Sequence, residues 1–335
     1  MSYNVAVVGA TGNVGREILN ILAERNFPVS EVFGLASSKS IGRKVSFGDK
    51  VIEVQNLANF DFSKADIALF SAGSSVSSEY APIAAKHCVV IDNTSFFRMF
   101  DDIPLIITEV NPGSLLDYKK RNIISNPNCA VMAIAVALKP LHDVAKIKRV
   151  VVTTLQSVSG AGKEAMDELY NQTKGKFFND YIPNNKFPKQ IAFNALPHIG
   201  DFNKNADTLE EQKVAEELQK ILDPNISVTA TCVRVPIFVG HSASVNVEFE
   251  KELSAEDARK ILKKAKGIEL VDNPSVNAYA TPVECVGEDP VFVSRIRRDL
   301  STKNGLNMWV VSDNLRKGAA LNAVQIAEEL INNYI

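Results

Sequence analysis

The sequence lacks several features that would place it at once in a broad class of proteins. No apolar run among its 335 residues approaches the roughly 20 residues that a membrane-spanning helix needs. Its four cysteines, Cys88, Cys129, Cys232 and Cys285, are widely spaced and form no Cys-x-x-Cys pair. Neither a zinc ribbon nor a disulfide framework is therefore predicted, and we expect no metal centre. Internal repeats are also absent, which argues against a solenoid.

An excess of charge is missing as well. The chain has 37 Lys and Arg residues against 39 Asp and Glu residues, a formal net charge of −2. Without a basic excess, nucleic acid is not predicted as a partner. Strand-like residues begin at Val5, so no secretory leader is predicted, and we expect a cytoplasmic enzyme with no membrane partner. The length is about twice that of a typical domain, which favours two domains.

Apolar residues at strand and helix spacing alternate through the first third of the chain. The predicted strands are Val5–Gly9, Glu31–Ala36, Ile67–Ser71, Val89–Asp92 and Leu105–Ile107, and the predicted helices are Arg16–Arg25 and Ser78–Lys86. This alternation is typical of βαβ units and predicts an α/β fold with a Rossmann-type doubly wound parallel sheet.

A glycine pattern lies between the first predicted strand and the first predicted helix. The spacing is GxxGxxG, and such a turn lets backbone amides and a helix N-terminus approach a pyrophosphate. A dinucleotide is therefore predicted here, although a plain tight turn would also need glycine. The predicted contacts in this turn are Gly9, Thr11, Gly12, Asn13, Val14 and Gly15.

The end of the second predicted strand indicates which dinucleotide binds. NAD sites usually hold an acidic residue about 20 residues after the glycines, where it binds the ribose hydroxyls. Residues 36–44 instead hold hydroxyls and cations and no acid, with Lys39 and Ser40 as the predicted contacts. We expect NADP, because these groups suit a 2′-phosphate. A solvated basic loop would have a similar composition.

Cys129 opens a strongly helical segment, Asn126-Pro-Asn-Cys-Ala-Val-Met-Ala-Ile-Ala-Val-Ala-Leu138. Pro127 and Asn128 are helix start signals, so Cys129 is predicted at a helix N-terminus. At that position the helix dipole and free amides favour a thiolate and can hold an oxyanion. The sequence therefore predicts a nucleophile, although an unpaired cysteine is more often an inert core residue.

Three further residues supply the remaining parts of an acyl-transfer site for an anionic substrate. Gln156 ends a predicted strand before a glycine-rich bend, Arg234 ends another, and His241 follows seven residues later. Nucleophile, base, amide and guanidinium together suit covalent catalysis. Sequence separation does not show that they meet, and His198 is an alternative base.

Seven segments together resemble the bacterial aspartate-semialdehyde dehydrogenase family, over essentially the whole chain. They are VAVVGATGNVG from Val5, SFFR from Ser95, NPNCA from Asn126, LQSVSGAG from Leu155, CVRVP from Cys232, His241, and MWVVSDN from Met308. Related acetylglutamyl-phosphate reductases carry an NPGC-type motif, and Asn128 argues against them.

The resemblance implies a reversible, phosphorylating reaction. NADPH reduces L-4-aspartyl phosphate to L-aspartate 4-semialdehyde and phosphate through a Cys129 thioacyl intermediate, in the biosynthesis of lysine and diaminopimelate, threonine and methionine. His241 is then the general acid/base and Gln156 orients the acyl group.

Substrate contacts follow from the same resemblance. It assigns Arg234 to the substrate carboxylate, Glu210 to its ammonium, and Lys213, Arg98 and Asn128 to phosphate. Whether Glu210 or Glu211 faces the substrate stays open. Ser159, Gly160 and Asn314 are implied as further cofactor contacts, although Asp313 or Asn314 could equally cap the last helix.

The resemblance and the pattern of predicted elements also suggest a domain division. A discontinuous NADP-binding domain is predicted from residues 1–128 and 315–335, and an α+β catalytic and dimerisation domain with a mixed sheet from residues 129–314. The family implies a homodimer. Two alternatives remain: another thioacyl dehydrogenase, of the acetylglutamyl-phosphate or glyceraldehyde-phosphate type, and a non-catalytic dinucleotide-binding regulator.

Overall fold

The computed structural model describes residues 1–335, and the chain divides into two compact units. Residues 1–128 and 319–335 form one, which we call the nucleotide unit, and residues 129–318 form the other, the central unit. The second boundary lies after residue 318 rather than after residue 314. The boundary falls within a π-helix, Arg316–Ala320. Its residues up to 318 belong to the central unit and its last two residues to the nucleotide unit.

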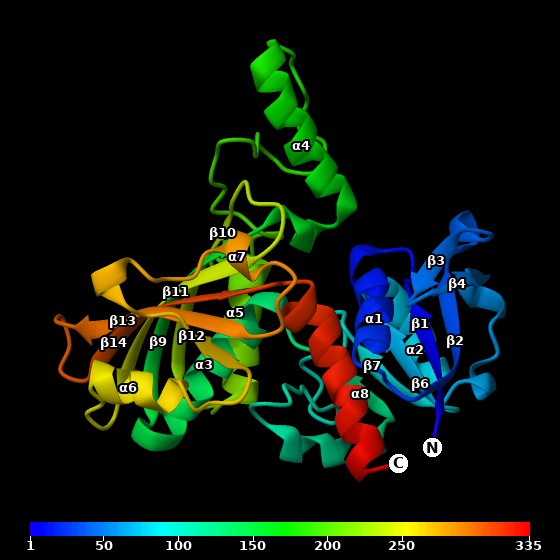
Figure 1. The fold of residues 1–335 in the computed structure, drawn as a ribbon, viewed down its shortest axis with the longest axis horizontal. Coiled ribbons are helices and arrows are strands. Elements are labelled where there is room, and N and C mark those ends of the chain that lie inside the picture. The colour runs from blue at the N-terminus through cyan, green and yellow to red at the C-terminus, as the bar shows by residue number, and fades with distance from the viewer. The chain divides into compact units, whose positions relative to one another are not determined.

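The nucleotide unit holds a six-stranded sheet in the order β5-β2-β1-β6-β7-β8, with every pair parallel (Figure 1). Its strands are β1 (Tyr3–Val8), β2 (Val29–Ala36), β5 (Gln55–Asn56), β6 (Ile67–Phe70), β7 (Val89–Asp92) and β8 (Ile123–Ser125). Its helices are α1 (Asn13–Glu24), α2 (Ser74–Ala84) and α8 (Leu321–Asn333).

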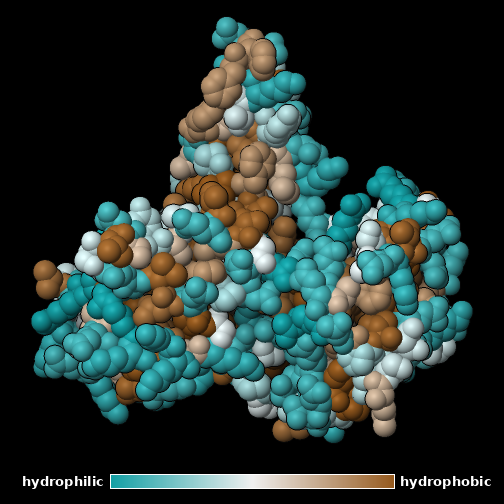
Figure 2. Space-filling model, viewed as in Figure 1, coloured by the Kyte–Doolittle hydropathy of each residue, from teal (hydrophilic) through white to brown (hydrophobic).

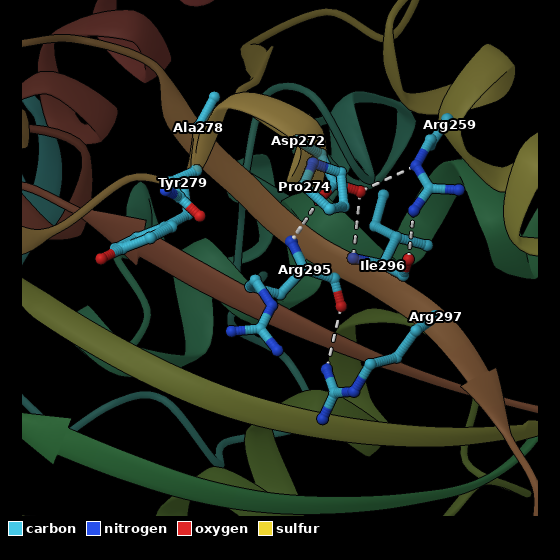
Figure 3. Close-up of a pocket in the computed structure, with 9 residues that line it drawn as sticks. Arg259, Asp272, Pro274, Ala278, Tyr279, Arg295, Ile296 and Arg297 are labelled. Carbon is cyan, nitrogen blue, oxygen red and sulfur yellow. Dashed lines mark hydrogen bonds and ion pairs between the residues drawn. The ribbon is translucent and has the colours of Figure 1, made fainter.

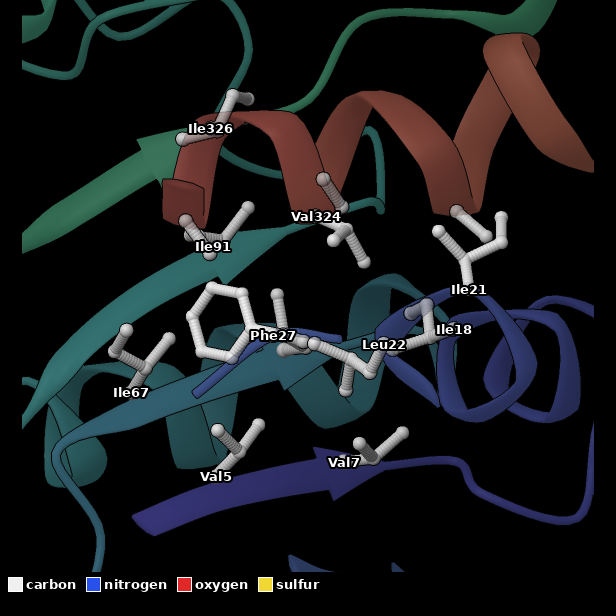
Figure 4. Packing of buried hydrophobic residues seen from close by; sticks show 14 of the residues in the cluster. Val5, Val7, Ile18, Ile21, Leu22, Phe27, Ile67, Ile91, Val324 and Ile326 are labelled. Atoms are coloured by element: carbon white, nitrogen blue, oxygen red, sulfur yellow. The ribbon is translucent and has the colours of Figure 1, made fainter. Parts of the chain in front are cut away.

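Both faces of this sheet are buried, because successive residues of β1 enter different cores. Val5 and Val7 belong to a cluster with α1 and α8, while Ala6 and Val8 belong to a second cluster on the other side. Figure 4 shows the first cluster, in which Val324 of α8 packs over the sheet near α1. The predicted Rossmann-type fold is therefore confirmed.

Two details of the nucleotide unit differ from the sequence prediction. Leu105–Ile107 is not a strand: Leu105 makes a single bridge to Ser125, and two strands that were not predicted, β5 and β8, complete the six. A hairpin of β3 (Lys44–Phe47) and β4 (Lys50–Glu53) was not predicted. Only Val45 of these two strands is buried, so the hairpin has few buried apolar positions and its sequence resembles that of a loop.

The central unit is built on a mixed six-stranded sheet in the order β10-β9-β11-β14-β13-β12. Its strands are β9 (Ile147–Gln156), β10 (Ser227–Arg234), β11 (His241–Phe249), β12 (Ile268–Leu270), β13 (Val291–Asp299) and β14 (Gly305–Ser312). Helix α3 (Cys129–Ala145) contacts both α5 (Leu209–Ile221) and α6 (Ala255–Leu262), and these three helices cover one face. Helix α7 (Pro282–Cys285) lies against β14.

A helical arm, α4 (Lys163–Phe178), extends away from this sheet (Figure 1). Glu168 and Gln172 tie the following loop to α4: Glu168 accepts bonds from the amides of Asn185 and Lys186, and Gln172 accepts bonds from those of Ile191 and Ala192. Hydrophobic side chains gather at the base of the arm in Figure 2.

Candidate active site

Strand pairing in the central unit gathers the predicted catalytic residues at one end of the mixed sheet. Strands β9 and β10 are parallel, and their last residues, Gln156 and Arg234, are register partners. Strand β11 is antiparallel to β9 and β14, so its first residue, His241, lies at the same end and pairs with Ser312. Residues far apart in sequence therefore meet at this end.

Cys129 is the first residue of α3, as the sequence predicts. It is half-buried, whereas the helix residues that follow are almost all buried. Gly318 lies directly against it: a Cβ on Gly318 would be 3.1 Å from Cys129 Cβ. Burial raises the pKa of Cys88, Cys232 and Cys285 to about 12. These three thiols are therefore protonated near neutral pH, which leaves Cys129 as the candidate nucleophile.

The His241 ring is 2% exposed, and its two nitrogens differ in their surroundings. Nδ1 lies 3.1 Å from the backbone nitrogen of Ser157 and 3.0 Å from its Oγ. Nε2 is buried and has no hydrogen-bond partner. Burial, and next the cation of Arg234, lower the pKa of His241 to about 3.

Gly160 marks the point where Arg234 and His241 come together. A Cβ on Gly160 would lie 3.2 Å from Arg234 Nη1 and 3.3 Å from His241 Nε2. Arg234 is 6% exposed, and its Nη1 donates to the Ser157 carbonyl at 2.7 Å. Burial lowers the pKa of Arg234, and negative charge on Glu210 and Cys129 opposes that shift. Hydrogen-bond donors therefore lie around a space beside Gly160.

Gln156 and α5 form the adjoining part of the site. Gln156 Nε2 donates to Glu210 Oε1 at 3.2 Å, and Lys213 Nζ lies 3.8 Å from Glu210 Oε2. Glu211 is used elsewhere: its carboxylate accepts the amides of Thr208, in a capping box, and of Cys232. Glu210 is thus the carboxylate on the side of Gln156.

Asn314 lies in the same region and does not cap a helix. Its Oδ1 accepts the Gly240 amide at 2.8 Å, and its Nδ2 donates to Ser159 Oγ at 2.9 Å. Asp313 instead accepts the amides of Leu315 and Arg316, as a cap would. Ser159 is buried beside it, while Gly160 is exposed.

The other two predicted phosphate ligands belong to the nucleotide unit. Arg98 is 7% exposed and donates to the carbonyls of Asn126 and Asn93, each at 2.9 Å. Asn128 is buried, immediately before Cys129 in the chain. His198, the alternative base, stacks on Phe202.

The glycine turn has the close packing that a dinucleotide cradle needs. A Cβ on Gly15 would lie 2.2 Å from the Gly9 carbonyl oxygen, and Gly9 has a φ of +89°. Helix α1 begins at Asn13, so its first amides, including that of Val14, face the turn. No side chain except hydrogen fits at Gly15, so strand and helix approach as phosphate binding requires.

A cavity of about 610 Å³ adjoins this turn. It is lined by Gly9, Thr11 and Gly12 and, after β2, by Ser37, Ser38 and Ser40, with no acidic residue. Lys39 is exposed at the same bend. The size and lining fit the nucleotide half of a dinucleotide.

A second hollow, of about 280 Å³, lies on the central unit around β13 (Figure 3). Asp272 accepts bonds from Arg259 Nε at 2.8 Å and from the amides of Arg295 and Ile296. None of the predicted site residues lines it.

Two further searches of the structure concern metals and membranes. No group of three or more His, Cys, Asp or Glu side chains is placed to hold a metal ion. None of the helices has both the length and the apolar character required to cross a bilayer.

Two residues of the site were not assigned from the sequence. Ser157 stands within the LQSVSGAG segment, but nothing in its local pattern shows that it contacts His241. Gly318 has no local signal either, because its role depends on a distant approach to Cys129.

Comparisons with known proteins match the whole chain. Two family models match, one described as semialdehyde dehydrogenase, NAD binding domain (residues 4–118), and one as semialdehyde dehydrogenase, dimerisation domain (residues 138–317). The aspartate-semialdehyde dehydrogenase of Rickettsia bellii is 57% identical over 334 residues, 99% of each chain, and that of Legionella pneumophila is 53% identical over 336 residues, 99% of this chain and 96% of the relative. The crystal structure of aspartate semialdehyde dehydrogenase II complexed with ASA from Vibrio cholerae superposes with a TM-score of 0.98 at 49% identity, covering 100% of both chains.

Proposed function

This chain belongs to the aspartate-semialdehyde dehydrogenase family, an oxidoreductase family acting on aldehyde groups, and from that premise we propose that it is the NADP-dependent, phosphorylating enzyme. The proposed reaction is the reversible reduction of L-4-aspartyl phosphate to L-aspartate 4-semialdehyde and phosphate. It serves amino-acid biosynthesis, and we propose the routes to lysine and diaminopimelate, threonine and methionine.

One observation carries the proposal. Cys129 is the cysteine that stands half-buried at a helix start, in the unit where a buried imidazole and a buried guanidinium meet beside Gly160. In the proposed reductive direction, the Cys129 thiolate attacks the acyl carbon and phosphate leaves with its electron pair. When bound, NADPH would supply hydride to the resulting thioester, and the thiohemiacetal so formed would release the aldehyde as its C–S bond breaks and the Cys129 thiolate is regenerated.

The proposed substrate contacts agree with the charges around the site. Arg234 can hold the substrate carboxylate in a two-point fork, which a buried guanidinium favours. Glu210, beside Gln156, suits the ammonium, and Gln156 orients the acyl group. Lys213 on α5, with Arg98 and Asn128 of the nucleotide unit, is proposed for phosphate, whose charge needs more than one donor.

NADP is proposed over NAD because hydroxyls, and no carboxylate, line the cavity after β2. Lys39 and Ser40 are the proposed 2′-phosphate contacts. Gly9, Thr11, Gly12, Asn13, Val14 and Gly15 are proposed for the pyrophosphate, and Ser159, Gly160 and Asn314 for the nicotinamide side.

A homodimer is proposed through the open face of the mixed sheet. Thr153, Ser244 and Trp309 are cross-strand neighbours on this face, all exposed or half-buried, while α3, α5 and α6 cover the opposite face. Light scattering should then give twice the chain mass of 36.6 kDa. A cytoplasmic location is also proposed.

The test is reduction of NADP⁺ by the purified protein with aspartate semialdehyde. We expect reduction to require phosphate and to be slower with NAD⁺. The variant C129A should lose turnover but keep NADPH binding, measured by cofactor fluorescence. Activity on N-acetylglutamate semialdehyde or a phosphorylated sugar aldehyde, with none on aspartate semialdehyde, would overturn the proposed substrate. Cofactor binding without any turnover would favour a regulator.

A further inference from the structure

Three asparagine side chains of the nucleotide unit are joined by hydrogen bonds, and we call them the asparagine network. Asn322 lies in the first turn of α8, Asn126 directly follows β8, and Asn93 directly follows β7. Asn322 Nδ2 lies 2.5 Å from Asn126 Oδ1, and Asn126 Nδ2 lies 2.6 Å from Asn93 Oδ1. Asn126 and Asn322 are 0% exposed, so water does not compete for their bonds.

Main-chain carbonyls determine which way each of these amide groups points. Each Nδ2 lies 2.9 Å from a main-chain carbonyl oxygen: that of Ile106 for Asn322, of Ala319 for Asn126 and of Phe70 for Asn93. A carbonyl oxygen can only accept, so the atom facing it must be the amide nitrogen. Asn126 therefore uses one amide proton on Ala319 and the other on Asn93, while its oxygen accepts from Asn322. A flipped Asn126 amide would lose all three bonds.

The main-chain carbonyls of Asn93 and Asn126 hold the guanidinium of Arg98. Arg98 Nε donates to the Asn126 carbonyl and Nη2 to the Asn93 carbonyl, each at 2.9 Å. Because a guanidinium is planar, two acceptors on different nitrogens fix both its plane and its direction. The spacing of these two acceptors depends on how residues 93 and 126 are held together. The bond from Asn126 Nδ2 to Asn93 Oδ1 joins them directly.

The direction of Arg98 matters because its side chain is 7% exposed and has little room to turn. A guanidinium binds phosphate through N–H groups of fixed geometry, so a change in its plane weakens those bonds. The carbonyls of Asn93 and Asn126 are neutral acceptors, which orient the guanidinium without cancelling its positive charge. They are therefore suited to present Arg98 to an anion.

Asn126 also stands close in the sequence to the other residues of the proposed site. It precedes Asn128, a proposed phosphate ligand, by two residues and Cys129 by three. Its partner Ala319 directly follows Gly318, the residue that packs against Cys129. The Asn126 side chain thus anchors the segment that leads to the nucleophile.

From these contacts we infer that Asn126, supported by Asn322, is a positioning residue for phosphate, because it holds the two carbonyls that aim Arg98. The inference rests on the proposed function, in which Arg98 binds phosphate. It adds two residues that do not touch phosphate themselves.

The step that depends on Arg98 is the exchange between thioester and acyl phosphate. In the oxidative direction an oxygen of phosphate forms a C–O bond to the acyl carbon, the C–S bond breaks, and the Cys129 sulfur leaves with the bonding pair. Formation of the thioester from the aldehyde involves no phosphate. Loss of the asparagine network should therefore weaken phosphate binding and spare the aldehyde and the cofactor.

The variants N126A and N322A test this separation. Both keep the two carbonyls, and N126A also keeps the main-chain bond from the Asn126 amide to the Asp92 carbonyl, so only side-chain bonds are lost. In the NADP⁺ reduction assay we expect the KM for phosphate to rise about tenfold, since bonds to a charged group are weakened. The KM values for aspartate semialdehyde and NADP⁺ should change little. Calorimetric titration of inorganic phosphate into NADP⁺-loaded protein should show the same rise in Kd.

A double variant shows whether the effect passes through Arg98. R98M should raise the KM for phosphate more than either asparagine variant does. Adding N322A to R98M should then raise it no further, because Asn322 has no guanidinium left to position. A general loss of structure would instead add to the effect of R98M.

The matched control is N122G, at the other end of β8. Asn122 Nδ2 donates to the Ala85 carbonyl at 3.1 Å, and its φ of +52° suits glycine, so the variant loses a similar bond without backbone strain. We expect a lower Tm with wild-type values of KM and Kd for phosphate.

Three results would overturn the inference: phosphate values in N126A and N322A equal to those of N122G, an equal rise in KM for all three substrates, or additivity of N322A with R98M. If N126A does not fold, N322A carries the test, because alanine is favoured within a helix. A wild type that binds phosphate, and binds it less tightly in the variants, but lacks turnover would count against the proposed function alone. An active enzyme with unchanged phosphate values in the variants would count against this inference alone, and a wild type that does not bind phosphate against both.

Discussion

Replacing Gly318 by alanine tests the packing of the proposed nucleophile. A Cβ at this position would lie 3.1 Å from Cys129 Cβ and 3.3 Å from its carbonyl oxygen, both closer than the ordinary contact range of 3.4–4 Å, and 3.4 Å from its Cα. The obstacle is the backbone and Cβ of residue 129, not the flexible end of a side chain. Cys129 also starts a helix whose next nine residues are buried, so it has little room to move.

The expected size of the effect follows from a displacement of a few tenths of an ångström. Overpacking of this kind costs about 1–3 kcal/mol, and each kcal/mol lowers Tm by about 2–4 °C for a unit of this size. Because a misplacement of 1 Å costs about a hundredfold in rate, we expect kcat to fall about tenfold. The rate at which iodoacetamide alkylates Cys129 should change as well, since that reaction needs the sulfur but no cofactor.

The control for this variant is G113A. Gly113 is exposed, nothing lies within 4 Å of a Cβ placed there, and its φ is not in the left-handed region. Both kcat and the alkylation rate should stay at wild-type values. If G318A also kept wild-type values of kcat, Tm and alkylation rate, Gly318 would not pack against Cys129 and the geometry proposed for the site would be wrong.

Three further predictions concern the cofactor turn, the substrate fork and the buried imidazole. G15A should abolish NADPH binding in a fluorescence titration, because its Cβ would lie 2.2 Å from the Gly9 carbonyl oxygen, whereas G113A, with nothing within 4 Å of its Cβ, should bind as wild type. R234K should lower kcat/KM for aspartate semialdehyde about a hundredfold without changing the Kd of NADPH, because a lysine cannot form the two-point fork; an unchanged kcat/KM would remove Arg234 from the substrate site. The pKa of His241 falls from 6.5 to about 3 on folding, so between these pH values the unfolded chain binds more protons than the folded chain. The contribution of His241 to stability is therefore present above pH 6.5 and is lost as the pH falls toward 3. In urea unfolding, the stability of wild type relative to H241Q should therefore fall by about 1.4 kcal/mol per pH unit below pH 6.5, and a constant difference would contradict a neutral buried ring.

Much of the fold follows from the local pattern of apolar residues, because a strand that is buried on both faces is apolar at successive positions. Continuous apolar runs such as Ile67–Phe70 are typical of central strands in a covered sheet, and this run was predicted as a strand. The segment Leu105–Ile107 is equally apolar but forms only a bridge, from Leu105 to Ser125 of the edge strand β8. Burial and strand pairing are thus different properties, and an apolar run reports only the first.

The candidate site divides in the same way. The position of Cys129 at a helix start is a local property, predicted by the Pro127 and Asn128 start signals and found in the structure. The choice between Glu210 and Glu211 is not local, since both stand in the first turn of α5. A capping box with Thr208 and a bond to the Cys232 amide engage Glu211, and these contacts depend on where α5 lies against β10.

Register explains why the remaining contacts depend on the whole central unit. Arg234 stands opposite Gln156, and His241 opposite Ser312, because the apolar residues of β9, β10, β11 and β14 pack against α3 and its neighbours. A slip of one residue in β11 would turn Val245 and Val247 out of that core and carry the His241 ring away from Ser157. The apolar core takes no part in the chemistry. Its packing nevertheless specifies which nitrogen of His241 contacts a donor and which one faces the space beside Gly160.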